Sequence, residues 1–200
     1  MDLQNKTVLV IGTGKSGIGA AGLLSKAGAR TILFDSNEKL DVEALKEKTA
    51  GISSLQLVTG TLPLELEEQV ELLVVSPGVP IDSDMVVSFE KRRIPVWGEI
   101  ELAYAFSKGE VIAITGTNGK TTTTTLVGEI MSAYKPSVFV VGNIGNPYTD
   151  IAMDTREDSV VVAEISSFQL ETIHTFAPKV SAILNITPDH LNRHHTMECY

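Results

Sequence analysis

Two short glycine-rich segments constrain the fold of this chain more than any other feature. Gly12–Gly17 (GTGKSG) follows the apolar run Thr7–Ile11, and Thr115–Thr122 (TGTNGKTT) ends the apolar run Val111–Thr115. Both segments precede a stretch of helical length. Apolar runs that alternate with amphipathic stretches of this length are typical of βαβ units and a parallel sheet. We therefore predict an α/β protein that contains two nucleotide-type units in tandem.

The remaining apolar runs continue this pattern. We expect a helix over Ile18–Ala27, which Gly28 would end. Further strands are expected at Thr31–Phe34, Leu72–Val75, Pro95–Trp97, Val138–Val141, Val160–Ala163 and Val180–Leu184, and further helices at Val42–Lys48, Met85–Lys91, Glu99–Phe106 and Thr121–Ala133. A boundary at Gly98 would divide the chain into a Rossmann-like domain of residues 1–98 and a P-loop-type α/β domain of residues 99–200.

Charge and composition exclude several classes of partner. Sixteen basic and 25 acidic residues give a net charge of −9, which would repel a nucleic acid. No apolar run approaches the roughly 20 residues of a membrane-spanning helix. The single cysteine, Cys199, rules out an intrachain disulfide framework and is typical of a reducing compartment. We expect a cytoplasmic monomer that binds neither nucleic acid nor membrane.

The second glycine segment has the parts of a phosphate-binding loop. Such a loop needs backbone N–H groups, a helix N-terminus and a lysine for the outer phosphates. Lys120 would reach the β- and γ-phosphates, and the Thr121 hydroxyl would bind Mg²⁺. Ile114 stands where the usual motif has its first glycine, so a plain strand–turn–helix remains the alternative. The expected nucleotide contacts are Gly116, Thr117, Asn118, Gly119, Lys120, Thr121 and Thr122.

A carboxylate for the metal is expected at the carboxyl end of a neighbouring strand. Glu164 follows four apolar residues, Val160–Ala163, and so ends a predicted strand. One protein carboxylate is sufficient for Mg²⁺, because this ion keeps several waters and also binds phosphate oxygens. A solvated strand end is the alternative. The lysine of the phosphate loop favours the metal role.

The first glycine segment matches G-x-G-x-x-G between a strand and a helix, and Asp35 ends the second predicted strand. Taken alone, this pattern indicates binding of a nicotinamide dinucleotide. Its physical content is only that a pyrophosphate can sit on the helix N-terminus, which a nucleotide-diphosphate sugar also satisfies. A tight turn without a ligand is a third interpretation.

Four motifs in order resemble those of the Mur ligases of bacterial cell-wall synthesis. They are TGTNGKTT, NIGNP at Asn143–Pro147, EISSFQLE at Glu164–Glu171 and NITPDHL at Asn185–Leu191. The resemblance spans the whole chain, and within the family it is greatest to the ligase that adds D-glutamate to UDP-N-acetylmuramoyl-L-alanine. It implies that the Ile114 variant is the family's own form of the loop.

The resemblance also implies roles for individual residues. ATP would bind at Gly116–Thr122, and two Mg²⁺ ions would be held by Thr121, Glu164 and His190, so that Lys120, Glu164 and His190 are the expected catalytic residues. The substrate would contact Lys15, Ser16, Asp35, Ser36, Asn37, Gly78, Asn143 and Ser166. Asn37 stands where the family often has an arginine. His194 and His195 are expected to be solvated or structural.

The chemistry implied is phosphorylation of a substrate carboxylate by ATP, followed by attack of the D-glutamate amine on the acyl phosphate. The family further implies a third domain, and a carbamylated lysine shortly after the DHL motif. The last lysine of this chain is Lys179, which precedes His190. We therefore expect the ATP-binding domain to be incomplete at Tyr200, and the chain to bind ligands without turnover. A nicotinamide-dependent oxidoreductase and a non-catalytic nucleotide-binding protein are the competing interpretations.

Overall fold

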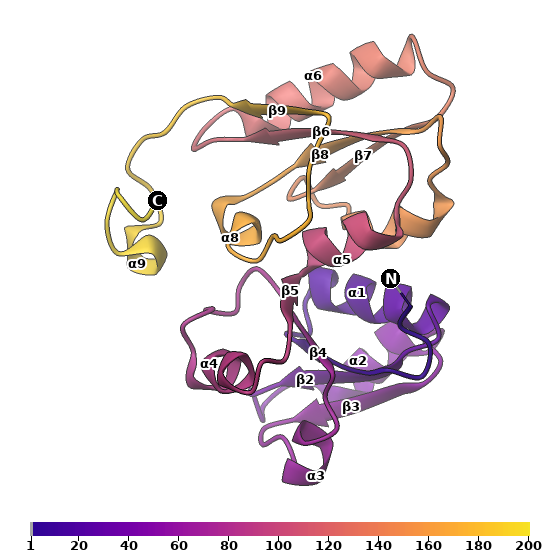
Figure 1. Cartoon of the computed structure of the whole chain (residues 1–200), viewed down its shortest axis with the longest axis vertical. Coiled ribbons are helices and arrows are strands. Elements are labelled where there is room, and N and C mark those ends of the chain that lie inside the picture. The colour runs from indigo at the N-terminus through magenta and orange to yellow at the C-terminus, as the bar shows by residue number, and fades with distance from the viewer. Residues whose placement is uncertain (1) are drawn as a thin grey trace.

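A computed structural model describes residues 2–200. Its strands form two parallel sheets, of five and four strands within that range, and helices pack between and around them (Figure 1). This arrangement confirms the predicted α/β class. Most predicted elements are present within one or two residues of the expected bounds.

The first sheet has the strand order β3-β2-β1-β4-β5. Its strands are β1 (Thr7–Ile11), β2 (Arg30–Asp35), β3 (Leu55–Thr59), β4 (Leu72–Val75) and β5 (Val96–Gly98). Its helices are α1 (Lys15–Lys26), α2 (Val42–Thr49), α3 (Leu64–Glu67) and α4 (Asp84–Lys91). The strand order reverses between β1 and β4, so their carboxyl ends diverge and leave a crevice there.

Strand β1 lies at the centre of this sheet and is covered on both faces. All five of its side chains are buried, and Val10 lies in parallel register with Leu33 of β2 and Val74 of β4. A strand that is covered on both faces needs a continuous apolar run, which is what the sequence contains. The backbone then turns sharply into α1, because a Cβ at Gly17 would lie 1.8 Å from the carbonyl oxygen of Gly12.

Helix α1 and strand β3 differ from the sequence prediction, and the short helix α3 was not predicted. Helix α1 begins at Lys15, not Ile18, because Gly14 already accepts the first helical hydrogen bond from Ile18 N. The glycine motif therefore forms the first helical turn as well as the loop. Strand β3 was not predicted. It lies at the sheet edge with partly exposed side chains, so its sequence, LQLVT, has only a weak apolar signal.

The second sheet has the order β7-β8-β6-β9. Its strands are β6 (Glu110–Thr115), β7 (Val138–Gly142), β8 (Val160–Glu164) and β9 (Val180–Ile183). The helical segments in this half are α5 (Glu99–Phe106), α6 (Lys120–Ser132), α7 (Tyr148–Ile151), the 3₁₀ turn η1 (Ala152–Asp154), α8 (Ser167–Leu170) and α9 (Leu191–His194). Helix α6 covers one face, as Figure 1 shows.

The two sheets share a core. Helix α1 of the first half packs on α7 of the second half, and α5 contacts both of these helices. One cluster of buried apolar residues accordingly includes Val10 and Leu24 from the first half and Ile100, Tyr148 and Val161 from the second. The two units therefore pack on one another through apolar surface. Across residues 2–200, no helix combines the length and apolar character needed to cross a membrane.

Candidate functional site

The second glycine loop joins β6 to the N-terminus of α6. Gly116 has a φ of +136°, and a Cβ there would lie 3.0 Å from the backbone oxygen of Asn185, so the position suits only glycine. The Nζ atom of Lys120 donates to the carbonyl oxygens of Gly116 at 2.7 Å and Thr117 at 3.0 Å. An ammonium group thus lies inside the loop, above the N-terminus of a 13-residue helix that favours anions.

The loop is fastened to the segment that follows β9. Asn118 N donates to Asn185 Oδ1, and Asn185 Nδ2 donates to Asn118 O, both at 2.9 Å. Thr187 N donates to Thr117 Oγ1 at 2.9 Å, and that hydroxyl donates to Thr187 O at 3.1 Å. These reciprocal bonds hold two of the four sequence motifs against each other and thereby position the residues up to His190.

Glu164 is the last residue of β8, in register with Ile114 of β6 and Gly142 of β7. Its side chain is 1% exposed. Oε1 accepts a hydrogen bond from Asn143 Nδ2 at 2.8 Å, whereas Oε2 has no partner among the described residues. A buried carboxylate oxygen without a partner is costly, and a cation would supply the missing interaction. This donor set suits Mg²⁺.

The phosphate loop opens onto a cavity of ≈ 380 Å³ at the carboxyl ends of the strands. Five of the predicted site residues line it: Gly116, Lys120, Asn143, Ser166 and His190. Glu164 lies behind Asn143, to which it is hydrogen bonded. The side chains of Thr121 and Thr122 are exposed on the first turn of α6. A volume of this size is typical of small-molecule sites.

His190 occupies the N-cap position of α9 with a φ of +52°. Its ring packs on Phe168 with a centroid distance of 4.9 Å, and its Nε2 atom lies 3.6 Å from Asp189 Oδ2. Within residues 2–200, no three His, Cys, Asp or Glu side chains gather into a ready metal centre. A metal at this cavity would therefore also need ligands from phosphate oxygens and water, which is usual for Mg²⁺.

A second cavity, of ≈ 310 Å³, lies at the crevice between β1 and β4. Three predicted substrate residues, Asp35, Ser36 and Gly78, line it. Asp35 also braces the first glycine loop, since its Oδ2 accepts from Thr13 N at 3.2 Å and from Thr13 Oγ1 at 2.7 Å. Asn37 is not among the lining residues, and its side-chain oxygen accepts from Lys39 N at 3.0 Å.

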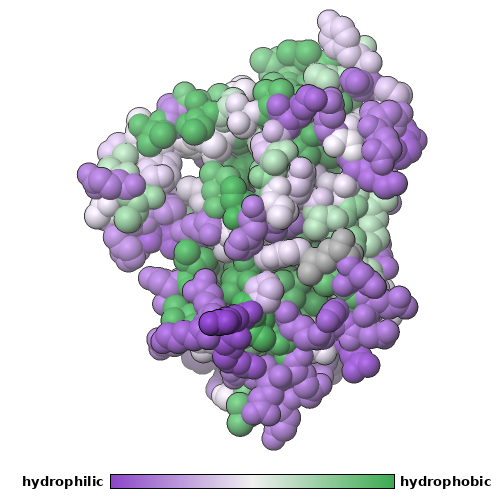
Figure 2. Space-filling model, in the orientation of Figure 1, coloured by the Kyte–Doolittle hydropathy of each residue, from purple (hydrophilic) through white to green (hydrophobic). Residues whose placement is uncertain are grey.

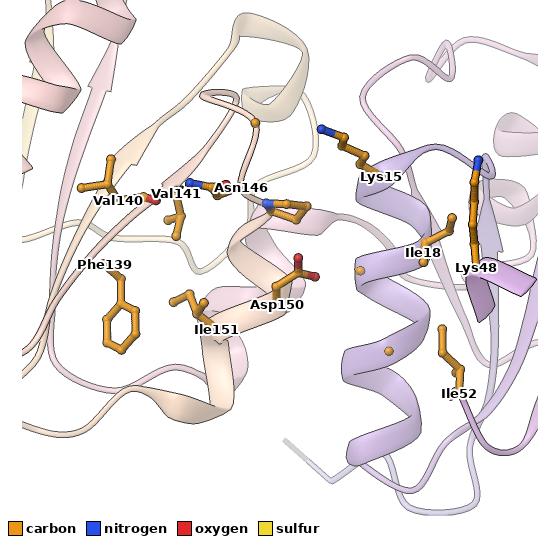
Figure 3. Close-up of a pocket in the computed structure, with 14 residues that line it drawn as sticks. Lys15, Ile18, Lys48, Ile52, Phe139, Val140, Val141, Asn146, Asp150 and Ile151 are labelled. Carbon is orange, nitrogen blue, oxygen red and sulfur yellow. Dashed lines mark hydrogen bonds between the residues drawn. The ribbon is translucent and has the colours of Figure 1, made fainter. Parts of the chain in front are cut away.

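Lys15 and Ser16 lie at neither of these cavities. Lys15 lines a cleft of ≈ 700 Å³ between α1 and the β7–α7 segment, and Asp150 of α7 also lines this cleft (Figure 3). Ser16 lies beside the buried carboxyl of Glu99 on α5. Burial raises the pKa of Glu99, while the polar groups of Ser16 and Gln169 oppose this shift. The start of α1 is therefore also part of the junction between the two units.

The structure adds residues that sequence reasoning did not select. Asn185, Asp189, Phe168 and Tyr200 line the cavity of the phosphate loop. Three of them belong to the EISSFQLE and NITPDHL motifs. The motifs therefore pointed to these segments, but the spacing within a motif did not show which of its residues line the cavity. Tyr200 lies outside these motifs, and its hydroxyl is 2.9 Å from Thr117 Oγ1.

Two parallel α/β units, each with a glycine loop after an inner strand, place the chain among the phosphate-loop α/β proteins. Two family models match the chain. The model described as the Mur ligase MurD-like N-terminal domain matches residues 6–98, and the Mur ligase middle domain matches residues 114–200. The chain belongs to the Mur ligase family.

Individual relatives agree with this assignment. The chain is 64% identical to the UDP-N-acetylmuramoylalanine–D-glutamate ligase of Lachnospira eligens and 60% identical to that of Lachnoclostridium phytofermentans. Each match covers all of this chain and 44% of the relative, so the chain spans less than half of their length.

Solved structures show the same fold. UDP-N-acetylmuramate–alanine ligase of Thermotoga maritima has a TM-score of 0.55 at 23% identity, and the match covers 97% of this chain and 45% of that one. A UDP-N-acetylmuramate:L-alanyl-γ-D-glutamyl-meso-diaminopimelate ligase from Neisseria meningitides has a TM-score of 0.58 at 17% identity, with 94% and 63% covered.

Proposed function

We propose that this chain supplies the UDP-substrate site and the ATP site of a ligase that adds D-glutamate to UDP-N-acetylmuramoyl-L-alanine in cytoplasmic peptidoglycan precursor synthesis. The observation that carries the proposal is one cavity that unites Lys120, Asn143 and His190, with the buried Glu164 beside it. The relatives that are 60% and 64% identical carry the name of this ligase.

In this proposal ATP binds along Gly116–Thr122. The Lys120 ammonium neutralises the β- and γ-phosphates, and the N-terminus of α6 adds its partial positive charge. Glu164, Thr121 and His190 would hold Mg²⁺ at two sites, and the metal would supply further neutralisation of phosphate charge. Oε2 of Glu164 has no partner among residues 2–200, and this supports the assignment, because a cation would satisfy Oε2 while Oε1 accepts from Asn143.

The reaction proposed has two steps. A carboxylate oxygen of the muramoyl-alanine attacks the γ-phosphorus of ATP, the bond to the ADP oxygen breaks, and an acyl phosphate forms. The amine of D-glutamate then attacks the acyl carbon and loses a proton, and the tetrahedral intermediate expels phosphate. The residues named here position the reactants and neutralise charge, and they form no covalent bond to them.

The uridine part of the substrate is assigned to the cavity lined by Asp35, Ser36 and Gly78, and Asn37, the next residue after Ser36, would also contact the substrate. Lys15 and Ser16, at the N-terminus of α1, would contact the diphosphate. Asn143 and Ser166 would line the path of the muramoyl peptide towards the ATP site.

We also propose the domain boundary at Gly98, where β5 ends and α5 begins.

Titration calorimetry on this chain tests the proposal. UDP-N-acetylmuramoyl-L-alanine and Mg-ATP should bind, and NADH should not. Lys120→Ala should weaken ATP binding at least tenfold and leave UDP-substrate binding unchanged, because the two sites use different loops. Binding of NADH in preference to UDP would support the oxidoreductase alternative, and loss of both ligands in Lys120→Ala would make Lys120 structural.

Turnover is a separate test. The last lysine of the chain precedes His190, so the carbamylated lysine that the family resemblance implies is not supplied by these residues. We expect no phosphate release that depends on both D-glutamate and the UDP-substrate from this chain. In a longer protein that contains the chain, Lys120→Ala should abolish acyl-phosphate formation. Release from the chain alone would contradict the first expectation.

A further inference from the structure

Arg193 joins three segments that are far apart in the sequence. It lies in α9, and its side chain is only 12% exposed. Nη2 donates to Glu171 Oε2 at 2.5 Å, and Nε lies 3.2 Å from both carboxylate oxygens of Glu171. Nη2 also donates to the carbonyl oxygen of Val79 at 2.8 Å, across 114 residues. The guanidinium carbon lies 5.1 Å from the centre of the Phe168 ring.

Burial and additional hydrogen bonds hold the Arg193–Glu171 ion pair in one geometry. The Glu171 side chain is 15% exposed, so the ion pair is largely screened from water. His194 supports it from the same helix, because its Nε2 atom lies 2.9 Å from Ser167 Oγ and its Nδ1 atom 3.5 Å from Glu171 Oε1. The planar guanidinium group of arginine carries several N–H donors. Only this side chain can therefore bond a carboxylate and a carbonyl oxygen and also stack on an aromatic ring.

The three segments belong to the two cavities described above. Val79 follows β4 and lines the second cavity, together with Asp35 and Gly78. Phe168 and His190 line the cavity of the phosphate loop. Arg193 itself is among the lining residues of neither, and it stands between them. The guanidinium thus connects the loop at Val79 to helix α9, whose first residue follows His190.

We propose that Arg193 is a positioning residue that ties the loop at residues 76–82 to helix α9, so that ligand binding at the second cavity, beside Asp35 and Gly78, orders His190 at the cavity of the phosphate loop. The tie itself rests only on the contacts given above. The identity of the ligand, a uridine diphosphate group, rests on the proposed function.

Hydrogen exchange measured peptide by peptide, without ligand, tests the tie. Arg193→Met should speed exchange at least tenfold in residues 76–82 and in residues 189–195, because the bond to Val79 is lost and Glu171 is left buried without its partner. Arg92→Met is the matched control. Arg92 also bonds a carboxylate and a carbonyl oxygen, both of Glu67, and lies 5.1 Å from the Phe89 ring, but within the first unit. It should leave both peptides unchanged.

Arg193→Lys keeps the test decisive if Arg193→Met does not fold. A lysine can still pair with Glu171, but its single ammonium cannot also reproduce the bond to Val79. We expect near-normal thermal stability together with exchange in residues 76–82 that is at least tenfold faster than in the natural chain. Equal exchange of this peptide in the natural chain and in the folded Arg193 variants would overturn the proposal.

A ligand arm separates positioning from a merely structural role. UDP should slow exchange in both peptides of the natural chain, and in Arg193→Lys it should slow only residues 76–82. UDP-dependent protection of residues 189–195 that persists in Arg193→Lys would overturn the coupling. If UDP does not bind the natural chain, the proposed uridine site fails, and the comparison without ligand still decides whether Arg193 holds the loop.

Discussion

Two buried carboxylates on α5 show how much a residue depends on its immediate surroundings. Glu99 is 2% exposed, and its Oε1 accepts from Gln169 Nε2 at 2.7 Å, whereas Oε2 has no partner within residues 2–200. Glu101 is 0% exposed and accepts backbone hydrogen bonds from His174, Thr175 and Phe176. Burial raises the pKa of Glu99. For Glu101 burial acts in the same direction, but the hydrogen bonds outweigh it and the pKa is lowered.

These shifts predict opposite pH dependences. Glu99 favours the folded state while it is protonated, so its contribution to the free energy of unfolding is complete below the ordinary pKa of 4.5 and is lost as the pH rises through the raised value. Glu101 contributes above 4.5 and loses its contribution as the pH falls through the lowered value. Urea unfolding of Glu99→Gln and Glu101→Gln across pH 3 to 8, each compared with the natural chain, should give differences of opposite slope. Two flat differences would contradict the assignment.

At the scale of secondary structure, the second sheet contains one fully buried strand and one fully exposed strand. All side chains of β8 are buried, and all those of β9 are exposed. Val180, Ile183 and Ile186 in and after β9 are exposed apolar residues, as are Leu126 and Ile130 of α6. Figure 2 shows apolar surface over α6 and β9. An apolar strand therefore does not by itself mark the core of this protein.

One substitution made in two strands tests this contrast. Val162 in β8 is 0% exposed and Val180 in β9 is 54% exposed. Val162→Thr places a hydroxyl in the core and should cost about 1–3 kcal/mol of unfolding free energy. Val180→Thr should stay within about 0.5 kcal/mol of the natural chain. Urea denaturation measures both, and equal losses would mean that β9 is covered in solution.

The sequence predicted elements well where a buried strand left a continuous apolar run. β1, β4 and α5 have the predicted bounds, Thr7–Ile11, Leu72–Val75 and Glu99–Phe106. Prediction was poorer at the sheet edge, where the five residues of β3 include one exposed position and no fully buried one. The prediction also placed the start of α1 too late, because the first turn of this helix contains loop-motif residues, including Gly17, that do not have a helical pattern.

At the scale of the whole molecule, the two sheets are joined by packing. Tyr148 of α7 is fully buried in the shared core, and its hydroxyl lies 2.6 Å from Ser107 Oγ beyond the end of α5. Burial raises the pKa of this tyrosine to about 12. The contacts of α1 with α7 and of α5 with both place apolar surface from the two halves in one cluster. Such a shared core favours cooperative unfolding of the two units.

We expect one unfolding transition for the chain. Trp97, the single tryptophan, lies in β5 of the first sheet, whereas far-ultraviolet circular dichroism reports on helices of both halves. The two signals should have the same midpoint in urea. Tyr148→Ala should lower the midpoint of both signals and reduce the free energy of unfolding by about 3–5 kcal/mol. Tyr148→Phe should reduce this free energy by about 1 kcal/mol. Separate midpoints in the natural chain would show that the halves unfold independently.

The amino-acid sequence by itself determined the α/β class, the two glycine loops and the motifs that resemble the Mur ligases, because these depend on local periodicity and on residue types at short spacing. Only the tertiary structure decided which distant polar groups meet. Asn118 pairs with Asn185, Glu164 accepts from Asn143 through Oε1 while its Oε2 has no partner among residues 2–200, and Arg193 reaches the carbonyl of Val79. Such contacts depend on how the strands are ordered and how the two units pack, and no short stretch of sequence contains that information.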